Sequence, residues 1–285
     1  MLTTLIALAM EQEFGNVLDS HIVELIEDAD EEWTPVTIEN ALDMSTGMYK
    51  FKKYPIDDYF LNCRFFDQEQ HPKKLEIALT CYNKRKSKPG KVFAYHSSDY
   101  YVAAVALRSL MHAKGLNDDL VEYYNSRIIR PLRIGNMTQG SILKTLDETE
   151  HIYGSTGLFF TIDDVLKLSR FINPGYGDRG KINGEQILDL TGLDKGMQND
   201  PDNRGVCFRG DSRKYSYKLG FWAREFDFPE CPSMNNIPIA KGLAGSLIAF
   251  LPNNTTYTHF SSSLLEDRIY DIEDIAKESI KIRCL

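Results

Sequence analysis

The sequence has no excess of positive charge and no long hydrophobic run, and each absence excludes a class of protein. Its 33 Lys and Arg residues are outnumbered by 41 Asp and Glu residues, which gives a net charge of -8. A protein that binds nucleic acid by releasing counterions from phosphates needs a basic surface, so nucleic acid is not an expected partner. The apolar stretch at residues 2–10 is too short to span a bilayer, and no membrane partner is expected.

Motifs for metals and cofactors are missing as well. The five cysteines lie at wide, unrelated spacings, which fits neither a disulfide framework nor a zinc knuckle. None of the six histidines belongs to an H-x-H or H-x-x-x-H pair. The G-x-G-x-x-G at residues 175–180 follows a predicted helix instead of a strand, and isoleucine stands where a phosphate loop needs Ser or Thr. The sequence therefore predicts no metal and no cofactor.

The chain does contain enough apolar residues for a large buried core. Hydrophobic residues make up 42% of its 285 residues and charged residues 26%, as in ordinary globular proteins. Residues 2–10 are apolar on nearly every side of a helix, which predicts a helix at the centre of a domain. A buried helix that begins at residue 2 has neither an N-cap residue nor preceding chain over its first N–H groups. We therefore expect the domain to be incomplete at its N-terminus.

Helical spacing and capping signals continue to about residue 212. Thr37 and Thr161 each stand before a short periodic stretch in a position typical of an N-cap residue, so a helix is expected after each of them. A longer helix is expected from Ser98, with Gly115 as its C-terminal stop.

The pattern changes to short β-branched or aromatic runs beyond about residue 213, which predicts about three antiparallel strands. An amphipathic helix is expected to follow and to cover one face of the sheet. One domain is therefore predicted over residues 1–285, with its helical part at about 1–212 and its sheet and last helix at about 213–285. The expected strands and helix are residues 216–226, 245–252, 255–262 and 264–280, in that order.

Short segments in a fixed order carry a resemblance to a known family. Together they resemble the serine β-lactamase and penicillin-binding-protein-like superfamily, nearest its carboxylesterase and 6-aminohexanoate-oligomer-hydrolase-like branch. The resemblance covers nearly the whole chain. It implies a β-lactamase/transpeptidase-like α/β fold, with an antiparallel sheet flanked by helices, a mostly helical subdomain, and the N-terminal strands missing. The segments are residues 37–47, 89–98, 131–135, 153–164, 220–222, 240–246 and 250–253.

In this family a serine nucleophile and a lysine lie one helical turn apart in S-x-x-K, and a tyrosine in Y-x-N or Y-x-S approaches the serine. The lysine or the phenol takes the proton that would otherwise keep the hydroxyl a poor nucleophile. Tyr95-His96-Ser97 matches the Y-x-S variant. The resemblance implies that Tyr95 transfers protons and that Ser97 orients the leaving group, whereas an aromatic residue ahead of an N-cap serine is the structural alternative.

The substrate side of the site is implied by two further segments. Residues 240–242 (A-K-G) match the K-T-G-like strand, so Lys241 and Gly242 would line the substrate and the Leu243 backbone N–H would stabilise the oxyanion. A glycine at a sheet bend is the alternative interpretation of this strand. Trp222 would form a wall of the acyl pocket, or be an ordinary core tryptophan.

The S-x-x-K motif is not where the resemblance places it. It is expected at the N-terminus of the buried helix, immediately before Met1, and is absent from the chain. The other match, residues 141–144 (S-I-L-K), follows the Tyr95 segment and precedes the polar residues 145–150, so it is not expected to be the nucleophile motif. Residues 45–47 and 155–157 (both S-T-G) are similar to K-T-G in sequence. They are not expected to be the K-T-G-like strand, because both match structural blocks of the family.

Two functions remain open at this point. The chain is expected to be either a truncated serine hydrolase domain, whose complete form cleaves a small amide or ester through an acyl-enzyme, or a noncatalytic remnant or interaction module. In the family the N-terminal strands pair with the last strand of the sheet. Self-association through an exposed strand at residues 255–261 is therefore also expected.

Overall fold

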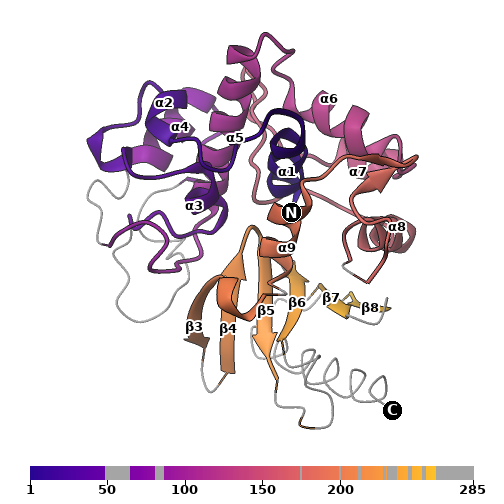
Figure 1. The fold of residues 1–285 in the computed structure, drawn as a ribbon. Helices are drawn as coiled ribbons and strands as arrows, with labels where there is room; N and C mark the ends of the chain where they lie inside the picture. Colours follow the sequence, from indigo (N-terminus) through magenta and orange to yellow (C-terminus); the bar gives the residue numbers. More distant parts are fainter. Residues whose placement is uncertain are drawn as a thin grey trace.

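The chain folds into a helical part that packs on an antiparallel sheet, as Figure 1 shows for the computed structural model. This is the mixed α/β architecture that the sequence predicts. None of the helices in the described ranges has the length and apolarity needed to cross a bilayer. The structure describes residues 1–48, 65–80, 87–173, 175–198, 200–210, 213–226, 229, 236–242, 246–251 and 255–260.

The helical part surrounds α1, whose residues from Leu2 to Met10 are buried. A helix that is apolar on every side is stable only inside a core, and α1 contacts both α5 and α6. Gly15, with φ 65°, ends α1. The helices are α1 (Leu2–Phe14), α2 (Ile22–Leu25), α3 (Ile38–Leu42), α4 (His71–Thr80), α5 (Ser97–Ala113), α6 (Leu120–Tyr124), α7 (Asn136–Gly140), α8 (Ile162–Ile172) and α9 (Leu190–Met197).

The predicted caps form. The Thr37 side chain accepts a hydrogen bond from the Asn40 N–H and the Asn40 side chain accepts one from the Thr37 N–H, so a capping box starts α3. Thr161 and Asp164 form the same reciprocal pair at the start of α8. Both helices therefore begin where the sequence indicates.

Within the described ranges the sheet has six antiparallel strands, in the order β3-β4-β5-β6-β7-β8. The prediction of about three strands is therefore wrong. One predicted run, residues 216–226, holds the second half of β4 and all of β5, because a tight turn at Leu219 and Gly220 divides it. Pro238 in β6 weakens the strand signal there. The strands are β3 (Val206–Gly210), β4 (Arg213–Lys218), β5 (Phe221–Glu225), β6 (Asn236–Lys241), β7 (Leu247–Leu251) and β8 (Thr255–His259), besides a small hairpin of β1 (Lys181–Ile182) and β2 (Glu185–Gln186).

Strand β8 lies at the edge of the sheet and, within the described residues, pairs only with β7. Its first residues are partly covered, because the Asn173 side chain donates hydrogen bonds to the Thr255 carbonyl at 3.1 Å and the Thr256 hydroxyl at 3.2 Å. The helix predicted at residues 264–280 lies outside the described residues. The predicted self-association through this strand stays a proposal.

Helix α9 lies against β4 and β5, where it joins the sheet to the helical part (Figure 1). A Cβ atom at Gly196 would lie 3.1 Å from the Phe221 ring, so only glycine allows this close approach without displacement of the ring. Phe221 and Phe250 of the sheet belong to the same hydrophobic core as α1. One continuous core therefore holds the helical part and the sheet together.

Candidate functional site

A group of aromatic side chains fills the junction between the segment before α5 and strands β4 and β5. The Tyr95 ring stacks on Trp222, with ring centroids 5.6 Å apart and an interplanar angle of 24°. Phe93 meets Trp222 edge-on at 5.6 Å, and Tyr217 does so at 5.2 Å. Edge-on and offset contacts of this kind add to the energy of burial. The aromatic cluster consists of Phe93, Tyr95, Tyr215, Tyr217 and Trp222.

Strand register brings Lys241 to the same place. Trp222 lies opposite Tyr217 on β4 and opposite Ile239 on β6, and Lys241 follows on the same face two residues later. The Lys241 Nζ lies 4.5 Å from the Tyr215 ring centroid and 5.2 Å from that of Trp222. Two aromatic faces attract the ammonium group. Three of the residues implied by the resemblance, Tyr95, Trp222 and Lys241, thus belong to one cluster.

The positions of the other residues give less support to the roles that the resemblance implies for them. Ser97 is half-buried and begins α5, two residues after Tyr95. The Gly242 N–H donates to the Ser246 carbonyl at 2.9 Å, so this amide is already used within the link between β6 and β7. Leu243, whose N–H was the expected oxyanion donor, lies outside the described residues.

The protonation of Tyr95 limits what its phenol can do. Burial raises the pKa of Tyr95 above its ordinary value, because the charged phenolate loses solvation. At neutral pH the residue is a neutral phenol that can donate a hydrogen bond or a proton. To act as a base it would need a nearby cation that lowers its pKa.

Sequence reasoning missed Tyr217 of the cluster and Tyr100, whose hydroxyl contacts it. The Tyr100 hydroxyl donates to the Leu42 carbonyl at 3.0 Å, and it lies 3.1 Å from the Tyr217 hydroxyl. Burial raises the pKa of both groups, so both are neutral. The alternation of Tyr215 and Tyr217 along β4 is the signal that could have placed Tyr217 beside Trp222. Tyr100 lies on a fully buried turn of α5 and carries no such signal.

The S-x-x-K at residues 141–144 does not have the geometry of a nucleophile and its base. The Ser141 hydroxyl donates to the Thr138 carbonyl at 2.9 Å and accepts from the Phe159 N–H at 2.9 Å. The Lys144 ammonium pairs with Glu150 at 2.7 Å. The serine and the lysine are therefore directed at other partners, as the sequence order predicts.

A serine–histidine contact occurs at the start of α5, where sequence reasoning did not look for one. The Ser98 hydroxyl is hydrogen-bonded to His96 Nδ1. Burial lowers the pKa of His96 to about 3, so the imidazole is neutral and has the form of a general base. However, Ser98 is only 2% exposed and His96 4%, so both side chains are buried and do not form an open site for a substrate carbonyl. Among the described residues, no three His, Cys, Asp or Glu side chains gather as a metal site.

The fold is shared with solved structures, although no protein-family model matches the sequence and no curated protein is significantly similar to it. A protein described as a 6-aminohexanoate-dimer hydrolase from Bacillus anthracis aligns with a TM-score of 0.66 and 16% identity, over 98% of this chain and 70% of that chain. A protein described as a β-lactamase from Bacteroides dorei DSM 17855 aligns with a TM-score of 0.59 and 14% identity, over 96% and 82% of the two chains.

A penicillin-binding protein homologue from Caulobacter crescentus is similar to the same degree, with a TM-score of 0.59 and 14% identity over 92% of this chain and 75% of that chain. At such identities the likeness establishes the fold and no more. The chain has the α/β fold of the serine β-lactamase and penicillin-binding-protein-like superfamily, as the ordered segments predict.

Proposed function

We propose that the chain is a β-lactamase-related serine hydrolase domain that holds the substrate-binding side of an acyl-transfer site. The convergence of Tyr95, Trp222 and Lys241 on one cluster, in a fold shared with hydrolases, carries this proposal. In this assignment Trp222 forms the wall against which the acyl group packs. Tyr95, as a neutral phenol, donates a hydrogen bond to the amide or ester, and Lys241 places a positive charge beside the substrate.

We also propose that these 285 residues do not form an acyl-enzyme. Acyl transfer needs a hydroxyl with a base in contact with it, and the S-x-x-K at 141–144 does not supply that contact. Tyr95 is a neutral phenol and cannot replace the missing base. Binding and hydrogen bonding to the substrate would remain, which leaves the chain with affinity for an amide or ester but without turnover.

A noncatalytic role is the second candidate, and the buried Ser98–His96 pair favours it. This serine has a suitable partner, yet it is enclosed by the protein. A chain that keeps the scaffold as an interaction module would have an intact fold and no affinity for small amides or esters.

A fluorescence titration separates the two candidates. The chain has two tryptophans, Trp33 and Trp222, so subtraction of the spectrum of Trp222→Phe isolates the Trp222 emission. The 6-aminohexanoate dimer is a suitable probe, because a structural neighbour is described as its hydrolase. We expect saturable quenching of Trp222 and no hydrolysis of the dimer.

Matched tyrosine variants provide the control. Tyr95→Phe removes the phenol oxygen from the cluster and should weaken the binding of the dimer several-fold. Tyr123→Phe removes a phenol that bonds Glu13 away from the cluster and should leave binding unchanged. Absence of any saturable quenching would favour the noncatalytic module.

A further inference from the structure

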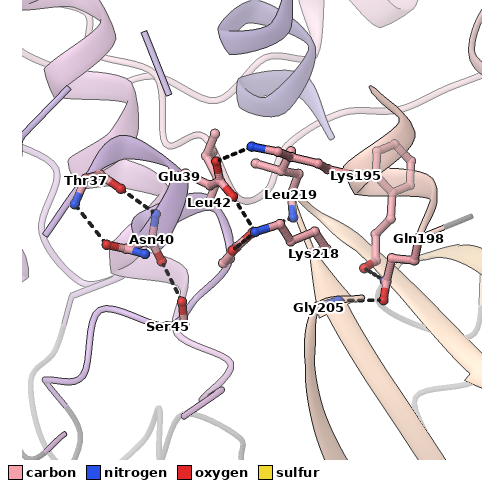
Figure 2. A network of polar contacts seen from close by, with 12 residues as sticks. Thr37, Glu39, Asn40, Leu42, Ser45, Lys195, Gln198, Gly205, Lys218 and Leu219 are labelled. Atoms are coloured by element: carbon pink, nitrogen blue, oxygen red, sulfur yellow. Dashed lines mark hydrogen bonds and ion pairs between the residues drawn. The ribbon is translucent and has the colours of Figure 1, made fainter. Parts of the chain in front are cut away.

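Four charged side chains join α3, α9 and the turn between β4 and β5, and we call them the Lys218 junction (Glu39, Asp43, Lys195 and Lys218). Figure 2 shows Lys218 directed toward Glu39 of α3, with which it forms an ion pair. Its Nζ also lies 2.7 Å from Asp43 Oδ2. Lys195 of α9 contacts the other oxygen of Glu39 at 3.2 Å. The Lys218 side chain is only 13% exposed, so solvent screens these pairs less than it would on an open surface.

The junction also fixes the backbone of the turn. The Leu219 N–H donates to Asp43 Oδ1 at 2.8 Å, next to the Lys218 contact on the other oxygen. Leu219 has φ 45° and Gly220 has φ 83°, the left-handed pair that a two-residue hairpin turn requires. Leucine rarely adopts this conformation, so its neighbours must hold it there.

The turn also fixes the position of Trp222, the proposed wall of the acyl site. Lys218 pairs with Phe221 across the hairpin, and the next pair outward is Tyr217 with Trp222. On the other side of the turn, a Cβ atom at Gly220 would lie 2.7 Å from the Tyr100 hydroxyl oxygen. A shift of the turn toward or away from α3 would therefore move Trp222 relative to Tyr95.

The charges in the junction support a fixed arrangement. Burial alone would raise the pKa of Glu39 and lower that of Lys218. The two lysines nevertheless lower the pKa of Glu39, and the two carboxylates raise the pKa of Lys218. Glu39 and Lys218 are therefore an ionised pair at neutral pH. Burial raises the pKa of Asp43 to about 6. The charge of Glu39 also raises this pKa, whereas the charge of Lys218 lowers it. The phenols of Tyr100 and Tyr217 also face Asp43 and are neutral.

We propose that Lys218 is a positioning residue, which sets the Gly220–Trp222 segment, and with it the stack of Trp222 on Tyr95, through its contacts with Glu39 and Asp43. The relevance of Lys218 to substrate binding rests on the proposed function of Tyr95, Trp222 and Lys241. Its effect on Trp222 does not, because that effect exists without a ligand.

The test compares three lysine variants by the near-UV circular dichroism and fluorescence of Trp222 in the absence of ligand. Lys218→Met keeps the apolar stem and removes the charge, and should abolish most of the Trp222 signal that depends on the stack. Lys218→Arg keeps the charge and should restore that signal. Lys195→Met breaks only the contact with Glu39, does not touch the turn, and should leave the signal unchanged.

A second measurement keeps the proposal open to refutation if Lys218→Met fails to fold. In the unaltered chain the Trp222 signal should change with a midpoint near pH 6 as Asp43 gains a proton, and Asp43→Asn should remove that transition. A folded Lys218→Met with an unchanged Trp222 signal, or an equal change in Lys195→Met, overturns the proposal. If Lys218→Met moves Trp222 but the unaltered chain does not bind the 6-aminohexanoate dimer, the positioning role stands and the proposed function fails.

Discussion

At the scale of single residues, Gly220 shows how closely the chain approaches itself beside the cluster. Besides the contact with Tyr100, a Cβ atom there would lie 2.7 Å from the Thr4 hydroxyl oxygen, in a left-handed conformation that disfavours any side chain. Steric crowding therefore explains why residue 220, the first of the G-F-W segment, is a glycine. Sequence reasoning could match this segment to the family, but the two hydroxyls that enclose it come from positions far away in the chain.

The first prediction concerns Gly220→Ala. Gly184→Ala is a matched control, because Gly184 has φ 86° and nothing within 4 Å of its Cβ position. The left-handed conformation alone should cost about 1 kcal/mol in Gly184→Ala. In Gly220→Ala the clash adds to it, for a total of about 3 kcal/mol. Chemical denaturation of the two variants measures the difference, and equal losses of stability would disprove the close packing around Gly220.

Among the elements, α4 joins the rest of the helical part through aromatic and polar contacts as well as through its buried aliphatic residues. The His71 and His151 rings stack with centroids 3.8 Å apart, and His71 Nδ1 lies 2.7 Å from the Tyr101 hydroxyl. The buried Lys74 ammonium lies 4.1 Å from the Phe65 ring centroid and 4.0 Å from that of Tyr153. Stacked imidazoles cannot both be charged at this distance, so α4 should be sensitive to acid.

The second prediction is a loss of stability in acid. Burial, followed by the charges of His71 and Arg108, lowers the pKa of His151 to about 3, while in the unfolded chain it is about 6.5. The unfolded state therefore binds more protons between these values, so stability rises with pH across that range and falls below about pH 6.5. At pH 5 the loss from this group is about 2 kcal/mol.

Urea unfolding as a function of pH checks this prediction. His151→Gln should remove part of the slope between pH 5 and pH 6.5. A stability that is flat down to pH 5 would show that His151 is not held in its neutral form.

The third prediction concerns the edge strand β8. We propose that the part of β8 beyond the Asn173 contacts can pair with a second copy of the chain, because an edge strand offers free backbone donors and acceptors. Thr258→Lys places a charge on this edge and should reduce association several-fold, as lysines on natural edge strands do. Light scattering over a range of concentrations measures it. A chain that stays monomeric at all concentrations would refute the proposal.

At the scale of the whole molecule, the sequence predicts features that depend on residues close together in the chain and misses features that join residues far apart. Helix α1 and the capped helices α3 and α8 depend on periodicity or on residues three apart, and they form where predicted. Strand β6 carries a proline and no clear alternation, so it is not predicted by pattern. The Lys218 junction joins residues 175 positions apart, so no local sequence pattern predicts it.

The candidate site follows the same rule. Tyr95, Trp222 and Lys241 could be named because each lies in a segment that resembles the family. Tyr100 and Tyr217 could not, because their contact depends on how α5 meets β4. The fold is thus predicted well by ordered short segments, whereas the surroundings of the site require the three-dimensional structure.

Intact-mass spectrometry after incubation with a serine-directed fluorophosphonate tests most directly the claim that the chain forms no acyl-enzyme. The probe reacts only with a serine that a neighbouring base activates. Since Ser141 is not in contact with Lys144 and Ser98 is buried, we predict that the mass of the 285-residue chain stays unchanged. A stoichiometric adduct on any serine would contradict this and show that the chain contains a working nucleophile.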